Sequence, residues 1–187
     1  MNIDVLRLTR PEFIALMPHL VDVHLLAMGY SQELRKNREK MWTMHSILPG
    51  FRCLLAHSGP QILGFSFGSY GTTSTWWHQQ VAAGLRLRNG NSPASTALLN
   101  NYFEVSEVHV SPVFQKRGIG RRLVVELLAD VTAPVALLST PEVPTESNGA
   151  FKLYRSLGFY DVLRQHLFAG DPRPFAILGA NLPLQGA

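Results

Sequence analysis

The sequence predicts an α/β fold in which helices flank a mixed β-sheet. Three observations lead to this prediction. Segments with the two-residue period of strands alternate with segments of helical period, and the short Ser58-Gly59-Pro60 connection predicts a hairpin. The later part of the chain runs strand–helix–strand–helix–strand. Because 187 residues are enough for one domain with its own core, we expect a single domain over residues 1–187.

Two helices and a hairpin are predicted in the first part of the chain. The first helix has apolar residues at helical spacing, Pro11 in its first turn and Gly29 after its end. Ser31, a residue type that caps helix N-termini, begins a second helix that Pro49-Gly50 ends. The predicted elements are a strand at 3–8, helices at 10–28 and 31–48, and strands at 51–57 and 61–70.

Residues 71–101 form an insertion rich in Thr, Ser, Asn and Gly. Structureless loops of this length are uncommon in compact domains and tend to be lids or binding loops. We expect one helix within it, over residues 76–87. The pair Trp76-Trp77 suits either the floor of a substrate pocket or a buried dimer contact.

The remaining elements alternate between strands and helices. A strand is broken by Pro112, and a short helix is ended by Gly158. The strand that begins at Pro134 is apolar nearly throughout, which predicts burial on both faces. The predicted elements are strands at 101–110, 134–140, 160–168 and 173–180, and helices at 119–131 and 148–157.

Composition sets limits on the class of protein. Charged residues make up 16% of the chain, below the usual level of about 25%, so we expect a partly apolar surface covered by a subunit or ligand. No apolar run approaches the roughly 20 residues that cross a bilayer, and the N-terminus lacks a signal pattern. We therefore expect a cytoplasmic protein with no membrane contact. The single Cys53 rules out an intramolecular disulfide, and the histidines show no paired ligand spacing, so no metal is expected.

The net charge of +4 leaves nucleic acid, a membrane or an anionic small molecule as partners. The tightest basic cluster is formed by Lys116, Arg117, Arg121 and Arg122 around a pair of glycines. This cluster suits a compact polyanion rather than a duplex. Because a recognition helix and an aromatic-basic strand platform are both missing, nucleic acid is not expected.

The segment from Val108 to Gly120 predicts a binding site for an anion. A strand ends, the chain turns, and a helix opens at Gly118 and Gly120. The first-turn N–H groups of a helix have no internal partners and lie at the positive end of its dipole. Such a site binds phosphate groups. The P-loop pattern fails because Gly-Lys-Ser/Thr is missing, and the dinucleotide fingerprint fails because a third glycine is missing.

Two segments resemble signatures of the GNAT superfamily of acetyltransferases. Residues 115–120, Gln-Lys-Arg-Gly-Ile-Gly, match its pyrophosphate loop Q/R-x-x-G-x-G/A. Downstream, Asn148-Gly149-Ala150 leads into Leu153-Tyr154 and Gly158-Phe159, which resembles its second signature. The resemblance covers nearly the whole chain, with its specific motifs between about residues 102 and 159.

This resemblance implies a mostly antiparallel mixed sheet with a V-shaped splay between its central strands, where acetyl-CoA lies. Backbone groups of the strand around Val108 would pair with the pantetheine and the acetyl carbonyl. Asn148 would either reach the pantetheine arm or cap the short helix, and both roles are compatible. The implied cofactor-binding residues are Val108, His109, Val110, Gln115, Lys116, Arg117, Gly118, Ile119, Gly120, Arg121, Asn148, Phe151 and Tyr154.

The implied reaction is attack of a primary amine, from a small molecule or a peptide, on the thioester of acetyl-CoA. Tyr154 matches the position that faces the coenzyme sulfur and would act as the acid. Glu104 aligns with a catalytic glutamate and is expected to be the base or to orient the amine; otherwise it is an exposed strand carboxylate. Ser106 and His109 are further candidates for a water relay. Glu107 lies on the opposite strand face and needs a partner if that face is buried.

Two further points stay open from the residues. The alternative to an enzyme is a CoA-binding module with little or no turnover. The expected apolar surface and the resemblance both favour a homodimer.

Overall fold

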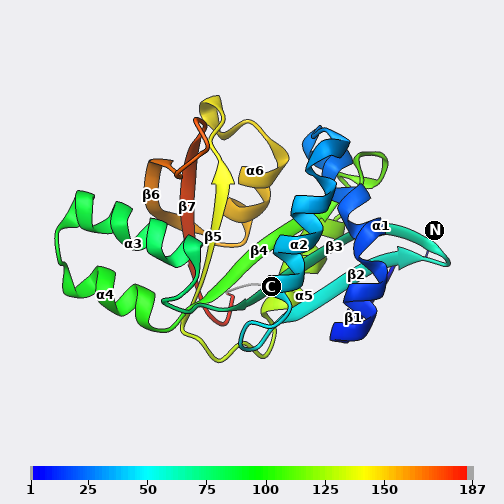
Figure 1. Cartoon of the computed structure of the whole chain (residues 1–187), viewed down its shortest axis with the longest axis horizontal. Coiled ribbons are helices and arrows are strands. Elements are labelled where there is room, and N and C mark those ends of the chain that lie inside the picture. Colours follow the sequence, from blue (N-terminus) through cyan, green and yellow to red (C-terminus); the bar gives the residue numbers. More distant parts are fainter. Residues whose placement is uncertain (1, 185–187) are drawn as a thin grey trace. The chain divides into compact units, whose positions relative to one another are not determined.

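The computed structural model describes residues 2–184 of the chain, and its strands form one mixed sheet (Figure 1). Hydrogen bonds join the strands in the order β1-β2-β3-β4-β5-β7-β6. The pairs β1–β2, β2–β3, β5–β7 and β6–β7 are antiparallel, and β4–β5 is parallel. The predicted mixed, mostly antiparallel sheet with flanking helices is therefore confirmed. The strands are β1 (Asp4–Leu8), β2 (Arg52–Ser58), β3 (Gln61–Tyr70), β4 (Phe103–Val110), β5 (Val135–Pro141), β6 (Tyr160–Leu167) and β7 (Pro174–Asn181).

The chain forms two compact units. Unit 1 comprises Met1–Ser69 and Val105–Ala129, and unit 2 comprises Tyr70–Glu104 and Asp130–Ala187. Strand β4 begins in unit 2 and continues in unit 1. The helices of unit 1 are α1 (Arg10–Met28), η1 (Gln32–Leu34), α2 (Arg35–His45), η2 (Pro112–Phe114) and α5 (Ile119–Leu128). Those of unit 2 are α3 (Trp76–Asn89), α4 (Pro93–Asn100), η3 (Pro144–Glu146) and α6 (Gly149–Ser156).

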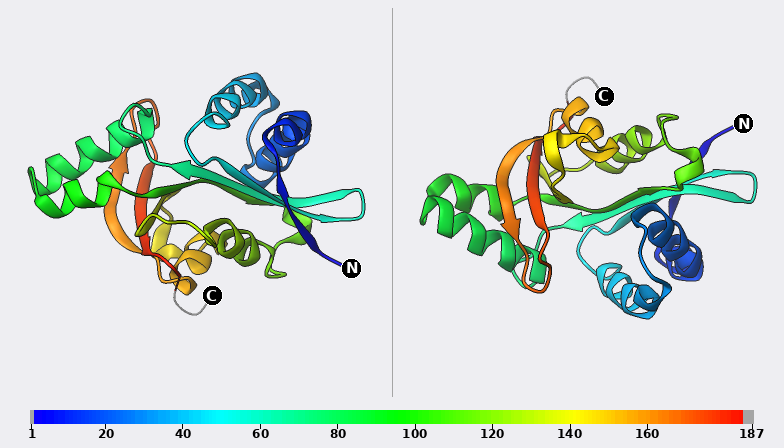
Figure 2. Two further views of the ribbon diagram at one scale, coloured as in Figure 1. Left: turned by 90° about the horizontal axis from the view of Figure 1, so that it is seen from below. Right: turned by 90° about the horizontal axis from the view of Figure 1, so that it is seen from above.

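In unit 1, α1 and α2 cover one face of the sheet and α5 covers the other (Figure 2). Phe13 and Leu20 of α1, Trp42 of α2, and Phe65 and Phe67 of β3 are buried in one apolar cluster. These side chains have almost no solvent-exposed surface, so they fix the two helices on the strands.

Helix α1 begins and ends as its sequence predicts. Thr9 and Glu12 form a capping box, and Gly29 ends the helix in the left-handed conformation. By length and composition, α1 is the one helix among residues 2–184 that could cross a membrane. A buried core helix passes the same test, and the face of α1 with Phe13 and Leu20 lies in the unit 1 core.

In unit 2, α3 packs on strands β5, β7 and β6. Val81 and Leu85 of α3 contact a core that includes Leu137 of β5, Leu163 of β6 and Ile177 of β7. Helix α6 lies on the other side of these strands (Figure 2).

The insertion is more ordered than the sequence predicts. The expected helix within residues 76–87 is α3, but a second helix, α4, follows where a loop was expected. Ser92 caps α4 and Pro93 stands in its first turn, two start signals that a Ser/Thr-rich composition obscures. The predicted helix over residues 31–48 is also divided, into η1 and the shorter α2. The other predicted elements are confirmed, with their ends shifted by no more than a few residues.

Candidate functional site

The predicted anion site is a strand–loop–helix in unit 1. After β4 and η2, the chain turns at Lys116 and Gly118, both with positive φ, and α5 begins at Ile119. Gly118 has φ 79° and caps α5 without a side-chain hydrogen bond. A side chain in this conformation costs about 1–2 kcal/mol, which is why glycine suits this position. A Cβ atom at Gly118 would meet no neighbour within 4 Å, so its geometry, not crowding, requires glycine.

The loop presents its groups to solvent. Gln115, Lys116, Arg117 and Gly118 are exposed, whereas Ile119 is buried and anchors α5. Positive side chains therefore surround the amide end of the α5 dipole, the arrangement that binds phosphate oxygens.

Side chains also brace the loop. Gln115 Nε2 donates to the carbonyl of Val110 at 3.1 Å and so ties the loop to the end of β4. The Arg117 guanidinium lies 5.7 Å from the Phe114 ring centroid. Arg122 is directed elsewhere in unit 1, because it pairs with Glu126 at 2.6 Å and donates to the Ile3 carbonyl.

Strand β4 carries a buried polar cluster on one face in unit 1. Glu107 Oε2 lies 2.6 Å from His109 Nε2 and 3.7 Å from His24 Nδ1, and the two histidine nitrogens are 2.9 Å apart. Trp42 Nε1 donates to Glu107 Oε1 at 3.2 Å, and Arg38 Nη1 lies 3.5 Å from the same oxygen. Glu107 therefore has four polar partners on this buried face: His109, His24, Trp42 and Arg38. The sequence predicted none of these contacts.

The electrostatics of this cluster follow from burial and charge. Burial alone acts to raise the pKa of Glu107, but the hydrogen bond from His109 and the charges of His109, His24 and Arg38 outweigh it and hold the pKa at about 2. Burial is also the main cause that lowers the pKa of His24 to about 4. At neutral pH, Glu107 is therefore a carboxylate and His24 is uncharged.

In unit 2, the second signature forms α6. Asn148 is its N-cap, since the side-chain oxygen accepts from the Phe151 N–H at 2.9 Å, and the predicted capping role is confirmed. Phe151 is fully buried, and the guanidinium groups of Arg155 and Arg164 lie 5.8 and 5.5 Å from its ring centroid. Tyr154 is 8% exposed and packs against Phe159 at 5.5 Å between ring centroids.

Glu104, at the start of β4 in unit 2, is only 4% exposed. The alternative prediction of an exposed strand carboxylate is therefore wrong: Phe103 and Glu104 pair with β5 inside the sheet, at Ala136 and Leu137. The charge of Glu104 acts to raise the pKa of two neighbours, His78 and Tyr102, which the sequence did not single out.

His78 and Tyr102 form a hydrogen-bonded pair, with 3.1 Å between His78 Nδ1 and the Tyr102 hydroxyl. Burial, followed by the charge of Glu104, raises the pKa of Tyr102 well above its usual range. Burial lowers the pKa of His78, and the Glu104 charge partly offsets this. The packing of α3, which lies in the insertion, brings His78 to Tyr102, 24 positions later in the chain. No local sequence signal could therefore have found the pair.

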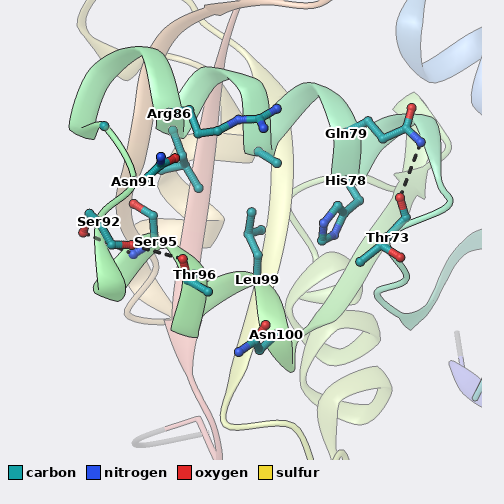
Figure 3. Close-up of a pocket in the computed structure, with 13 residues that line it drawn as sticks. Thr73, His78, Gln79, Arg86, Asn91, Ser92, Ser95, Thr96, Leu99 and Asn100 are labelled. Carbon is teal, nitrogen blue, oxygen red and sulfur yellow. Dashed lines mark hydrogen bonds between the residues drawn. The ribbon is translucent and has the colours of Figure 1, made fainter.

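His78 also borders a groove between α3 and α4 (Figure 3). The groove has a volume of about 350 Å³ and lies entirely within unit 2. Polar, uncharged side chains such as Gln79, Ser95 and Asn100 line it, and Arg86 is its charged member.

The predicted site residues thus fall into two groups. The cofactor residues of β4 and the phosphate loop, from Val108 to Arg121, lie in unit 1. Glu104 and the α6 residues Asn148, Phe151 and Tyr154 lie in unit 2.

Comparison with known proteins identifies the family. Residues 32–159 match the Acetyltransferase (GNAT) family. The chain is 38% identical over 184 residues to the GCN5-like protein acetyltransferase of Mycobacterium tuberculosis, which covers 87% of this chain and 89% of that protein. It is also 47% identical over 60 residues to the N-alpha-acetyltransferase RimI of the same organism, which covers 32% of this chain and 36% of that protein.

Solved structures share the fold. The structure of YncA from Salmonella typhimurium with its cofactor acetyl-CoA aligns with a TM-score of 0.60 at 15% identity, over 100% of this chain and 98% of that one. The family match over residues 32–159 and the 38% identity to the mycobacterial protein acetyltransferase show that the chain belongs to the GNAT family of acetyltransferases.

Proposed function

We propose that this protein transfers the acetyl group of acetyl-CoA to a primary amine of a peptide or a small molecule. The observation that carries the proposal is the exposed, basic loop at Gly118, which begins α5 in a chain of the GNAT family. The names of the two mycobacterial relatives, a protein acetyltransferase and an N-alpha-acetyltransferase, support an amine acceptor.

We assign the cofactor roles from the resemblance to the family, and the geometry within each unit is compatible with them. The pyrophosphate is assigned to the first amides of α5 and to the side chains of Lys116, Arg117 and Arg121. The pantetheine is assigned to the β4 backbone from Val108 to Val110. Because the Asn148 side-chain oxygen caps α6, its amide nitrogen is the group left to bind the pantetheine.

The chemistry requires one proton acceptor and one proton donor. An alkyl amine has a pKa of about 10 and arrives protonated, so it first loses a proton, which we assign to Glu104 directly or through water. The neutral nitrogen then attacks the thioester carbonyl carbon. As the tetrahedral intermediate collapses, the carbon–sulfur bond breaks and its electron pair remains on sulfur. The Tyr154 hydroxyl then donates its proton to the thiolate. The tyrosinate recovers a proton from the former amine nitrogen, which becomes the neutral acetamide nitrogen, and Glu104 releases the first proton to water, so the products are an acetamide and CoA.

The first test is calorimetric titration of the full-length protein with acetyl-CoA and with CoA. We expect saturable binding of both. We expect roughly tenfold weaker binding by Gly118→Ala, because alanine disfavours the left-handed conformation by about 1–2 kcal/mol and the free loop would relax out of the binding conformation. Gly59→Ala is the matched control. Gly59 lies in the β2–β3 turn of unit 1 with φ 55° and open space around its Cβ position, so this variant carries similar strain away from the loop.

Equal affinity in the wild type and in a folded Gly118→Ala variant would show that the loop does not hold the pyrophosphate. Absence of binding to either ligand would contradict the proposed function itself.

A further inference from the structure

The side chains of His24, Glu107 and His109 in unit 1 direct potential metal-ligand atoms toward one another. His24 comes from α1, and Glu107 and His109 come from the face of β4 that α1 covers. His109 Nε2 lies 2.9 Å from His24 Nδ1 and 2.6 Å from Glu107 Oε2, and His24 Nδ1 lies 3.7 Å from Glu107 Oε2. His24 and His109 are buried, with 2% and 9% of their surface exposed.

With both histidines neutral, protons alone can supply only one shared hydrogen bond among these three atoms. His109 Nε2 can carry one hydrogen, and it faces both Glu107 Oε2 and His24 Nδ1. If His109 donates that hydrogen to Glu107, His24 Nδ1 can accept only the second branch of a bifurcated hydrogen bond. If His24 donates instead, a lone pair of His109 faces a carboxylate oxygen at 2.6 Å. A cation bound by all three atoms gives each lone pair its own bond.

The donor set indicates which cation. Two imidazole nitrogens and one carboxylate oxygen are a ligand set of zinc sites that keep an open coordination position. Ligand atoms about 2.0–2.1 Å from a tetrahedral zinc ion lie about 3.3 Å apart, and the observed distances of 2.6–3.7 Å span this value. To reach about 3.3 Å, the separations of 2.6, 2.9 and 3.7 Å would change by about 0.7, 0.4 and 0.4 Å.

The surroundings orient the carboxylate as metal sites require. Trp42 and Arg38 both contact Oε1 of Glu107, which leaves Oε2 directed at the histidines. Such outer contacts are what orient metal ligands in proteins. The positive charge of Arg38 also opposes a cation, so the site is expected to be weaker than a structural zinc site.

We infer that His24, Glu107 and His109 form a binding site for one divalent transition-metal ion of the Zn²⁺ type. The site joins α1 to β4 in unit 1, with Val108 between two of its ligands on the strand. Metal binding there would hold β4 against α1, and its detection is independent of acetyl transfer.

The test is titration of untagged, EDTA-treated full-length protein with Co²⁺, with binding monitored by absorption in the visible region. Zn²⁺ is then added to displace the bound Co²⁺. We expect one equivalent to bind, and the melting temperature to rise because the ion binds the folded state. His109→Ala and Glu107→Gln should each weaken binding by at least about 10–100-fold, the loss that follows removal of even an outer contact of a metal ligand. Glu107→Gln keeps the shape of the side chain, so it serves even if the histidine variant does not fold.

His19→Ala is the matched control, because His19 lies on the same helix as His24 but is exposed. Its affinity should equal that of the wild type. The inference is wrong if no stoichiometric Co²⁺ or Zn²⁺ binding occurs at an excess of metal. It is equally wrong if binding survives unchanged in folded His109→Ala and Glu107→Gln proteins, since another site would then hold the ion.

Discussion

At the scale of single residues, the assigned acid and base are buried polar groups rather than surface side chains. Tyr154 is 8% exposed and Glu104 is 4% exposed. Burial strengthens electrostatic interactions and excludes water, both of which favour proton transfer at a defined position. The residue type and the signature position predicted their roles, but their burial depends on the strands and helices packed around them.

Replacement of Tyr154 by Phe tests the acid. The hydroxyl is lost while the ring and its contact with Phe159 are kept, so the helix should stay in place. We expect kcat to fall by about 10²–10⁴-fold, the range for a positioned proton donor. The affinity for CoA, measured by calorimetry, should stay nearly unchanged.

An unchanged kcat in Tyr154→Phe would assign the proton donor elsewhere. Wild-type protein that binds CoA but turns over no amine would instead favour the CoA-binding module without catalysis.

At the scale of elements, local signals and long-range contacts contribute differently. Helix α1 matches its predicted ends because the first-turn Pro11 and the terminal Gly29 are local signals. The α3–α4 insertion was only half predicted, because its Ser- and Thr-rich composition is also typical of a loop. Its stability comes from contacts far along the chain, such as Trp77 Nε1 donating to Ser139 at 3.2 Å.

The entry to this insertion makes a prediction about stability. A Cβ atom at Gly71 would overlap the ring of Tyr102, which is buried and hydrogen-bonded to His78. Gly71→Ala should therefore lower the free energy of unfolding by about 1–3 kcal/mol, as overpacking does. Thermal unfolding followed by circular dichroism measures the change.

Gly149→Ala is the control, because a Cβ atom at this first residue of α6 meets no neighbour within 4 Å. Its melting temperature should be unchanged or slightly higher. Equal melting temperatures for Gly71→Ala and the wild type would show that Tyr102 can move aside at little cost.

At the scale of the whole molecule, ion pairs in unit 2 connect segments that the sequence separates. Glu142, which follows β5, accepts hydrogen bonds from Arg164 at 2.9 Å and from the Gln165 N–H at 2.7 Å, both on β6. Arg164 and Arg155 also pair with Glu146, at 2.8 and 2.6 Å. The loop that leads to the Asn148 cap is thereby joined to β6 and α6.

This network predicts how acid affects stability. Hydrogen bonds from Arg164, opposed by burial, lower the pKa of Glu142 from 4.5. A carboxyl with a lowered pKa in the folded state stabilises the protein above its unfolded pKa, and that stability is lost as the pH falls through the folded value. Glu142→Gln should lose about 1.5–3 kcal/mol at pH 7, the range for a hydrogen bond to a charged group.

The difference in melting temperature between wild type and Glu142→Gln should therefore shrink as the pH falls below about 4.5. Glu126→Gln is the comparison, because its partly exposed i,i+4 pair with Arg122 contributes only about 0.3–0.5 kcal/mol. A constant Glu142→Gln difference across the acid range would show that the carboxylate charge is not what stabilises the loop.

The sequence by itself determined the order of the strands and of the helices other than α4, the glycine turn at Gly118 that opens α5, and the helix α6 with its Asn148 cap. These features depend on neighbours within a few residues, so their periodicity, caps and turn residues are readable along the chain. The resemblance to the family follows from the same two segments.

Only the tertiary structure decided what surrounds the polar side chains of β4. His24 lies 85 positions before His109, and His78 lies 24 positions before Tyr102, yet each pair is within hydrogen-bonding distance. The expectation of no metal rested on the spacing of histidines along the chain, and that spacing does not reveal the His24–Glu107–His109 cluster. Spacing along a chain constrains distance only within one helix or strand, whereas packing of α1 and α3 on the sheet sets which distant groups share a buried site.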